Sequence, residues 1–255
     1  MQGKTEQNTN YETESTGSAQ LRVMRVLKSP PMGRLCSARY EREARQHGWQ
    51  RVAGLDEVGR GSLFGPVLAG AVVLNPRRRI VGLDDSKKLT HDRRAELAER
   101  IREHALAWAT AEIAASRIDA WNIYQASKQA MVAAVSQLFP LPDYLLLDAM
   151  EIDLPIEQKA LIHGDARSVS IAAASILAKV ERDRRMEEYD QLYPHYGLAQ
   201  NKGYATQDHL DALRRHGPCP LHRFSYAPVR QAGCWASGAT QTPLPLENPS
   251  NVIGS

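Results

Sequence analysis

The chain has 255 residues, of which 43% are hydrophobic, so it can form one large domain or two small ones with a proper core. Its formal net charge of +3 is compatible with a polyanionic partner but too mild to require one. The three cysteines lack paired C-x-x-C spacing, which argues against a disulfide framework and a zinc site, and no run approaches the ~20 apolar residues of a membrane span. Because the amino terminus is polar and lacks an export signal, we expect a cytoplasmic protein.

Both ends of the chain differ in composition from its middle. Residues 1–37 are rich in Gln, Asn, Thr, Ser and Gly, and residues 233–255 are rich in Ser, Gly, Thr, Pro and Asn. The first segment cannot bury enough apolar surface to order itself and the second shows no apolar period, so we expect two disordered tails. The ordered domain is then predicted over residues 38–232.

Between these tails, strand and helix patterns alternate. In chain order we expect helix 39–47, strands 52–57 and 67–74, a helix capped by Thr90, strand 107–114, a helix capped by Ser116 and Asp119 that runs to about residue 138, strands 144–148 and 161–163, and helix 168–189. The first two strands are close enough to form an antiparallel hairpin. Such alternation implies an α/β sheet with helices packed on it and ligands at strand ends. Trp108 and Trp121 are predicted to lie in the core.

The first strand ends in the stretch VAGLDEVGRG, residues 52–61. Two adjacent carboxylates, Asp56 and Glu57, repel each other in an apolar setting unless a divalent cation or a proton neutralises them. The turn Gly59-Arg60-Gly61 permits positive φ and a close backbone approach to a ligand, and Arg60 can bind a phosphate. The alternative is an exposed acidic turn with ordinary hairpin glycines.

Four acids stand where a predicted strand ends: Asp56, Glu57, Asp148 and Asp165. Neighbouring strands can bring them together, and a site with oxygen ligands alone selects hard cations such as Mg²⁺ or Mn²⁺. A pair of such ions clamps the attacking and leaving oxygens of a phosphoryl transfer. Any one of these acids taken singly is as well explained as a surface residue or, for Asp165, as a favourable partner of a helix dipole.

At these residues the sequence resembles ribonuclease HII, the type 2 ribonuclease H family, in the family's motif order over roughly residues 39–230. The long alanine-rich segment and the glycine-arginine-glycine turn are together highly specific. The matching motifs are DEVGRG at 56–61, DDSKKL at 84–89, NI at 122–123, LLLD ending at Asp148, GDARSVSIAAASILAKVERD at 164–183, NKGYAT at 201–206 and HRFSYAPV at 222–229.

The resemblance implies a ribonuclease H-like α/β fold, with a mixed five-stranded sheet flanked by helices and a carboxyl-terminal helical extension. It implies that the four acids bind two divalent cations, Mg²⁺ or Mn²⁺, which activate water for attack on a phosphodiester. In this family the turn matching Gly59, Arg60 and Gly61 senses the ribose 2′-hydroxyl, and the tyrosine matching Tyr204 stacks on the deoxy side of an RNA–DNA junction. Ala149 stands where glycine is usual and His163 where lysine is usual, and both departures can alter metal affinity.

The implied substrate is an RNA/DNA hybrid, including a single ribonucleotide embedded in duplex DNA. Cleavage 5′ of the ribonucleotide at the junction leaves 3′-hydroxyl and 5′-phosphate ends, as ribonucleotide excision repair requires. We expect a monomer with no membrane partner.

The basic residues admit two interpretations. Lys87, Lys88 and Lys202 lie inside the matching motifs and are predicted to bind substrate phosphates; Lys179 and Arg223 are as well explained as solvated surface. His209 and His222 are better explained as hydrogen-bonded structural residues than as active-site groups.

Two other functions compete with this interpretation. A Holliday-junction resolvase or transposase nuclease would share acids on strand ends but would not need the turn together with Tyr204. A nucleic-acid or nucleotide-binding module without catalysis would carry a phosphate loop, and residues 59–65 have neither the Rossmann spacing nor the lysine and hydroxyl of a P-loop.

Overall fold

The computed structural model describes residues 36–236, so most of the two predicted tails lies outside the described residues. No helix in that range has both the length and the apolar character that a membrane crossing requires. The elements are α1 (Arg39–Gln46), β1 (Val52–Val58), β2 (Val67–Val73), η1 (Ser86–Lys88), α2 (His91–His104), β3 (Ala107–Ile113), α3 (Ala115–Trp121), α4 (Ile123–Ser136), β4 (Tyr144–Asp148), β5 (Glu157–Leu161), η2 (Gly164–Ala166), α5 (Val169–Leu192), η3 (Pro194–Tyr196), α6 (Leu198–Asn201), α7 (Gln207–His216) and α8 (Ala227–Ala236), where η marks a 3-10 helix.

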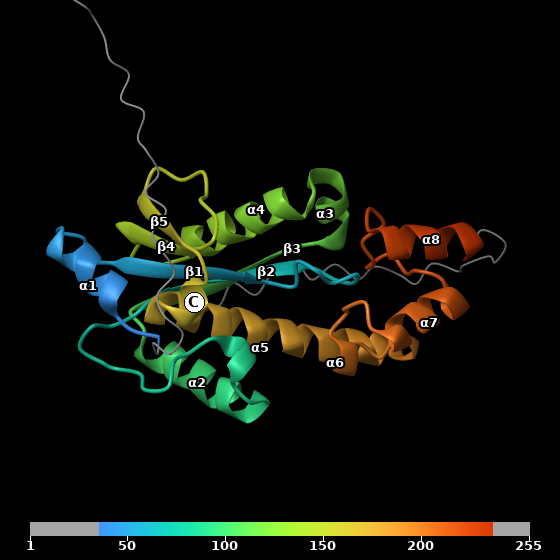
Figure 1. Cartoon of the computed structure of the whole chain (residues 1–255), viewed down its shortest axis with the longest axis horizontal. Coiled ribbons are helices and arrows are strands. Elements are labelled where there is room, and N and C mark those ends of the chain that lie inside the picture. Colours follow the sequence, from blue (N-terminus) through green and yellow to red (C-terminus); the bar gives the residue numbers. More distant parts are fainter. Residues whose placement is uncertain (1–35, 237–255) are drawn as a thin grey trace, which may run out of the picture. The chain divides into compact units, whose positions relative to one another are not determined.

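The strands form one five-stranded sheet in the order β3-β2-β1-β4-β5. Strands β1, β2 and β3 pair antiparallel, whereas β4 pairs parallel with both β1 and β5. The mixed five-stranded sheet and the hairpin of the first two strands are therefore confirmed. Helix α4 covers one face of the sheet, and α2 and α5 cover the other (Figure 1).

The carboxyl-terminal helices α6, α7 and α8 lie beyond one end of the sheet (Figure 1). They have their own apolar cluster, in which Phe64, from the loop after β1, is fully buried beside Tyr196 and Leu213. The loop that carries the glycine-arginine-glycine turn is thus packed against these helices, as expected for a helical extension.

Helix α5 packs unusually close to the sheet, because two strand glycines make room for it. A Cβ on Gly54 would lie 2.0 Å from the carbonyl carbon of Ser170, and a Cβ on Gly70 would lie 2.4 Å from the carbonyl oxygen of Ala174. The small residues 172–175 are buried along this contact. The amino-terminal end of α5 is therefore fixed beside β1.

The prediction of one continuous helix running to about residue 138 is wrong. Asn122 separates two helices there, α3 and α4. Asn122 has a φ of 77°, and its side chain caps α4 by accepting a hydrogen bond from Gln125 N at 3.0 Å. Asp119 does not cap a helix of its own segment. Its carboxylate accepts hydrogen bonds from Phe224 N and Ser225 N, both at 2.9 Å, and so ties α3 to the segment before α8.

Two smaller predictions also fail. The strand predicted over residues 161–163 instead spans Glu157–Leu161. It ends at Leu161 because His163 adopts a left-handed φ of 55°, and Ile162 is 69% exposed. Trp108 and Trp121, predicted in the core, are 40% and 39% exposed. Trp108 lies on the edge strand β3, where alternate side chains face solvent.

Candidate active site

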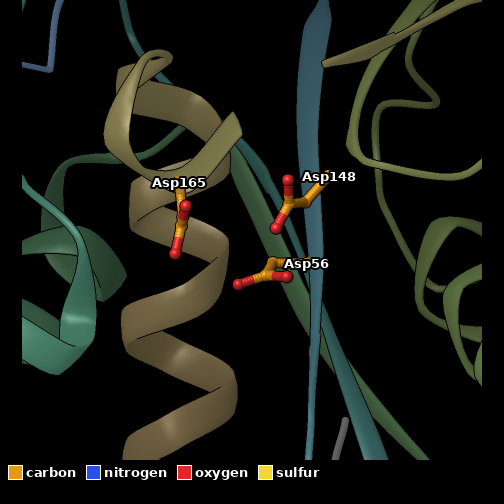
Figure 2. Close-up of side chains that lie close together, drawn as sticks. All are labelled: Asp56, Asp148 and Asp165. Atoms are coloured by element: carbon orange, nitrogen blue, oxygen red, sulfur yellow. The ribbon is translucent and has the colours of Figure 1, made fainter. Parts of the chain in front are cut away.

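The parallel pairing of β1 with β4 brings two aspartates together. Leu55 pairs with Leu147, so Asp56 and Asp148 are the next residues along two neighbouring strands. Leu55 and Leu147 pack on the α4 face, and side-chain alternation directs both aspartates toward the α5 face. Asp165 lies in η2, which immediately precedes α5. Ligand oxygens of the three aspartates all lie within 4.8 Å of one another, and Figure 2 shows them gathered between β1 and the helix.

Backbone hydrogen bonds orient all three carboxylates. The Oδ1 atom of Asp56 accepts from Glu57 N at 2.8 Å, that of Asp148 accepts from Gly164 N at 2.7 Å, and that of Asp165 accepts from the N–H that follows it at 2.9 Å. In each aspartate the backbone bond is accepted by Oδ1 and not by the second oxygen, Oδ2. In Asp165 this oxygen also accepts from Lys87 Nζ at 3.3 Å.

The electrostatics of the group favour a cation. Burial, followed by the charge of Glu57, raises the pKa of Asp56 well above its usual range. Burial also raises the pKa of Asp148, against the opposing effect of its bond from Gly164 N. Three clustered carboxylates, two of them buried, are costly when ionised and unpaired. These donors and this charge fit a hard divalent cation, so the three aspartates could hold a metal ion.

Glu57 lies outside this group of three. It directly follows Asp56 on β1 but is not among the residues whose ligand oxygens lie together. Its Oε1 accepts from Arg60 Nη1 at 3.1 Å, whereas its Oε2 is buried and has no hydrogen-bonding partner among the described residues. Burial raises the pKa of Glu57, and the Arg60 guanidinium opposes that rise.

The glycine-arginine-glycine turn and Tyr204 come together although they are far apart in the sequence. Gly59 has a φ of 89°, a conformation that favours glycine. A Cβ placed on Gly61 would lie 3.9 Å from Cε1 of Tyr204, which is ordinary van der Waals contact. The Tyr204 side chain is 37% exposed, so its ring is packed beside the turn and still accessible to a ligand.

A fully buried arginine, Arg223, supports this turn. Arg223 was expected to serve phosphates or to be solvated surface, but it is fully buried, so both expectations are wrong. Its guanidinium donates to the carbonyl oxygens of Arg60 at 2.9 Å, Gly65 at 3.0 Å and Pro66 at 3.1 Å. The Tyr226 hydroxyl donates to the same Arg60 carbonyl at 2.6 Å. The carboxyl-terminal extension thus fixes the backbone of the turn.

The two histidines are structural, as predicted, and they anchor the backbone at Tyr204. His222 Nδ1 accepts from Cys219 N at 3.0 Å, which leaves its proton on Nε2, 3.1 Å from Nε2 of His209. His209 Nδ1 then donates to the carbonyl oxygen of Tyr204 at 2.9 Å. Burial lowers the pKa of His222 to about 3, so this chain of hydrogen bonds consists of neutral rings at neutral pH.

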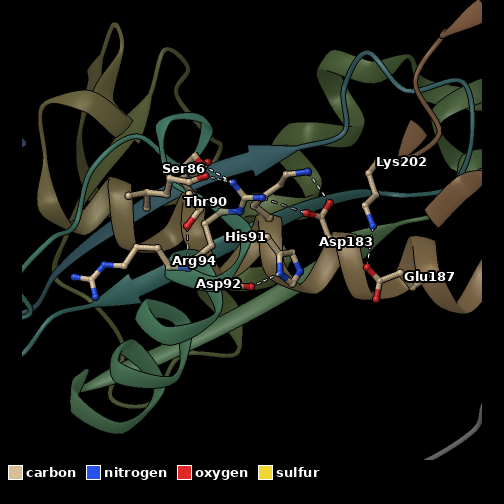
Figure 3. Close-up of polar contacts among 12 residues, drawn as sticks. Ser86, Thr90, His91, Asp92, Arg94, Asp183, Glu187 and Lys202 are labelled. Atoms are coloured by element: carbon tan, nitrogen blue, oxygen red, sulfur yellow. Dashed lines mark hydrogen bonds and ion pairs between the residues drawn. The ribbon is translucent and has the colours of Figure 1, made fainter. Parts of the chain in front are cut away.

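The predicted phosphate-binding lysines are in different surroundings. Lys87 is the one whose ammonium contacts the aspartate group, and Lys88 Nζ lies 3.6 Å from Asp84 Oδ1. Lys202 donates to Glu187 of α5 at 2.9 Å. Figure 3 shows this pair to one side of the partly buried ion pair between Arg94 and Asp183. The structure therefore joins one lysine to the acid group and leaves the other two paired with surface acids.

A mixed sheet with aspartates on adjacent parallel strands and helices on both faces is the ribonuclease H-like architecture. The family model for ribonuclease HII matches residues 53–229. Ribonuclease HII of Solibacter usitatus is 56% identical over 195 residues, which cover 76% of this chain and 86% of that protein. The chain therefore belongs to the ribonuclease HII family, and it is a ribonuclease H that acts on the RNA of RNA/DNA hybrids.

Solved structures agree on the fold. The crystal structure of ribonuclease H2 from Pyrococcus horikoshii matches with a TM-score of 0.63 and 24% identity over 72% of this chain and 97% of that one. A structure of Bst-RNase HIII in complex with Mn²⁺ matches with a TM-score of 0.60 and 21% identity over 76% of this chain and 73% of that one.

Proposed function

We propose that this chain is a divalent-metal-dependent endonuclease that removes ribonucleotides from DNA as well as cutting longer hybrids. At an RNA–DNA junction it cuts 5′ of the ribonucleotide and leaves 3′-hydroxyl and 5′-phosphate ends. The observation that carries this proposal is the contiguity of three features: the aspartate group, the turn that begins at Gly59, and the Tyr204 ring beside that turn.

The acids have separate roles in this proposal. Asp56, Asp148 and Asp165 would hold a divalent cation, Mg²⁺ or Mn²⁺, through carboxylate oxygens that lie within 4.8 Å of one another. Glu57 would join a second cation through Oε2, which is buried and unpaired among the described residues. Such ions activate water and stabilise the charge that develops on the leaving 3′ oxygen. Lys87, whose ammonium donates to Asp165, would orient the substrate phosphate beside these ligands.

Recognition of the sugar rests on the turn. Gly59 and Gly61 let the backbone approach a ribose, and the 2′-hydroxyl is the group that distinguishes ribose from deoxyribose. Arg60, held by Glu57, would meet the adjacent phosphate. The exposed part of the Tyr204 ring would stack on the following deoxyribose. Lys88 and Lys202 would add phosphate contacts once their surface ion pairs open.

One assay tests this function. The purified full chain is incubated with Mg²⁺ or Mn²⁺ and a DNA duplex that contains a single ribonucleotide, and the product ends are mapped. We expect one cut, 5′ of the ribonucleotide, which disappears in Asp56→Asn and in a duplex without the ribonucleotide. A cut on the 3′ side, or equal cleavage of the all-DNA duplex, would contradict the proposal.

We extend the proposal to the setting of the enzyme. Its catalytic domain would span residues 38–232 and work as a cytoplasmic monomer in ribonucleotide excision repair, without a membrane partner. The expectation of a monomer can be measured by light scattering of the purified chain, where a dimer mass would contradict it.

A further inference from the structure

We propose that Arg182 is a positioning residue that holds the Tyr204 ring against the glycine-arginine-glycine turn, and that discrimination of a single embedded ribonucleotide depends on this contact. This inference rests on the proposed function, because it concerns how the junction is recognised. Arg182 lies in α5 and faces the carboxyl-terminal extension rather than the aspartate group.

The first observation is the unusual environment of Arg182. Its side chain is fully buried, and its Nε, Nη1 and Nη2 atoms have no hydrogen-bonding partner among the described residues. Arg223, the other fully buried arginine, has all three of its nitrogens bonded to carbonyl oxygens. A buried guanidinium without such bonds is costly to the fold, so stability alone is a poor explanation for its presence.

The second observation is what Arg182 contacts. Its Cζ atom lies 5.3 Å from the centroid of the Tyr204 ring, within the range of a cation–π contact. A Cβ on Gly59 would lie 2.2 Å from Nε and 2.9 Å from Cδ of Arg182. The arginine side chain therefore occupies the space that a side chain at residue 59 would need. One guanidinium contacts both the turn and the tyrosine that are proposed to recognise the junction.

The contact is specific to the ring, because the backbone of Tyr204 is fixed by other groups. Its N–H donates to Asn201 O at 3.0 Å, and its carbonyl accepts from His209 at 2.9 Å. Even a Cβ added to Gly61 would come no closer than van der Waals contact with Cε1 of the ring. Loss of the guanidinium would then release the ring to other rotamers while the loop stays in place.

The experiment compares the full chain with Arg182→Met, which keeps the long stem, and with Arg182→Lys, which keeps the charge but not the planar group. Each is made alone and together with Tyr204→Ala. Arg184→Met is the matched control, because Arg184 lies on the same helix, is half exposed and pairs with Glu181. For every variant, kcat/KM is measured on a duplex with one ribonucleotide and on a long RNA/DNA hybrid, together with the melting temperature.

We expect Arg182→Met to lower the ratio of the two kcat/KM values roughly two- to thirtyfold, the range between an exposed and a desolvated cation–π contact. Arg182→Lys should recover part of that loss, and Arg184→Met should change nothing. In the Tyr204→Ala background, Arg182→Met should cause no further fall in the ratio, because the two residues act as a unit.

An equal loss on both substrates, or a full additional loss in the Tyr204→Ala background, would overturn the inference and leave Arg182 with a structural role. If Arg182→Met does not fold, the same comparison is decided by Arg182→Lys. The unmodified chain separates this result from the proposed function: failure of that chain to cut the embedded ribonucleotide would refute the function itself.

Discussion

Replacement of a proposed metal ligand should make the metal-free protein more stable while it abolishes cleavage. We choose Asp148→Asn, because asparagine retains an oxygen that can accept the bond from Gly164 N. The substitution removes one negative charge from a group whose ligand oxygens lie within 4.8 Å of one another. The protein without metal is then relieved of repulsion, whereas the protein with metal loses a charged ligand.

The magnitude follows from Coulomb's law. Two unit charges 4.8 Å apart repel by about 3.5 kcal/mol at an effective dielectric constant of about 20, and Asp148 takes part in two of the three pairs. Because the raised pKa of Asp148 favours its neutral form and Asp148 is only half-buried, most of this repulsion is relieved or screened. We therefore expect a net gain of about 2 kcal/mol, which corresponds to a rise of about 4–8 °C in Tm for a chain of this size.

The sign of the pH dependence is fixed by the raised pKa values of Asp56 and Asp148. Below the ordinary carboxyl pKa both groups are protonated in the folded and unfolded states, so the wild type and the variant should melt alike. As pH rises from that value through the raised folded pKa, the unfolded state releases protons first and the wild type loses stability. The advantage of Asp148→Asn should therefore appear above about pH 4 and persist at neutral pH.

Thermal melts in chelator and in Mg²⁺, from pH 4 to pH 8, provide the measurement. Mg²⁺ at about 100 times its Kd should stabilise the wild type by about 2.7 kcal/mol and the variant by much less. Glu103→Gln is the control, since it removes the same charge from an exposed position of α2. A metal-free variant that melts below the wild type at neutral pH, or that keeps near-normal cleavage, would refute the assignment of these aspartates.

Three further predictions concern the turn, a strained residue and a lysine. Gly61→Ala should fold normally and lose cleavage of an embedded ribonucleotide, whereas Gly59→Ala should also lower Tm, because Gly59 combines positive φ with contact to Arg182; normal cleavage by Gly61→Ala would contradict close approach of the turn to the sugar. Ala149→Gly should raise the unfolding free energy by up to about 1 kcal/mol in denaturant melts, since Ala149 has a φ of 54°; a loss of stability would contradict this. Lys88→Ala should reduce the log–log salt slope of hybrid binding by about one, and an unchanged slope would exclude a phosphate contact.

The sequence was sufficient where local pattern and topology act together. Asp56 and Asp148 each follow a short apolar strand, and parallel pairing of such strands brings their ends to the same edge. Ser168 and Thr90 cap the helices expected after them, accepting from Ile171 N and Arg93 N. Each of these features depends on few residues, so each can be predicted from the sequence.

The sequence was insufficient where a tertiary contact replaces a local one. Ser116 and Asp119 have the spacing of a helix cap, but Asp119 instead bonds Phe224 N and Ser225 N. The sequence near residue 119 does not indicate that these two backbone N–H groups are its partners. The break at Asn122 likewise lies within a run of apolar periodicity that two helices satisfy as well as one.

The burial of charged side chains was the feature hardest to predict from the sequence. These buried side chains also support the turn that we propose for sugar recognition. Arginines are mostly exposed, so composition assigns Arg182 and Arg223 to the surface, yet both are fully buried. Arg223 is anchored by carbonyl oxygens of the loop after β1, and Arg182 fits beneath Gly59 because that residue lacks a side chain. Beside the close approach to a sugar that we propose for the turn, Gly59 thus has a second function, which is to leave space for a buried cation. This second function gives a physical reason for glycine at residue 59 that the chemistry of the substrate alone does not supply.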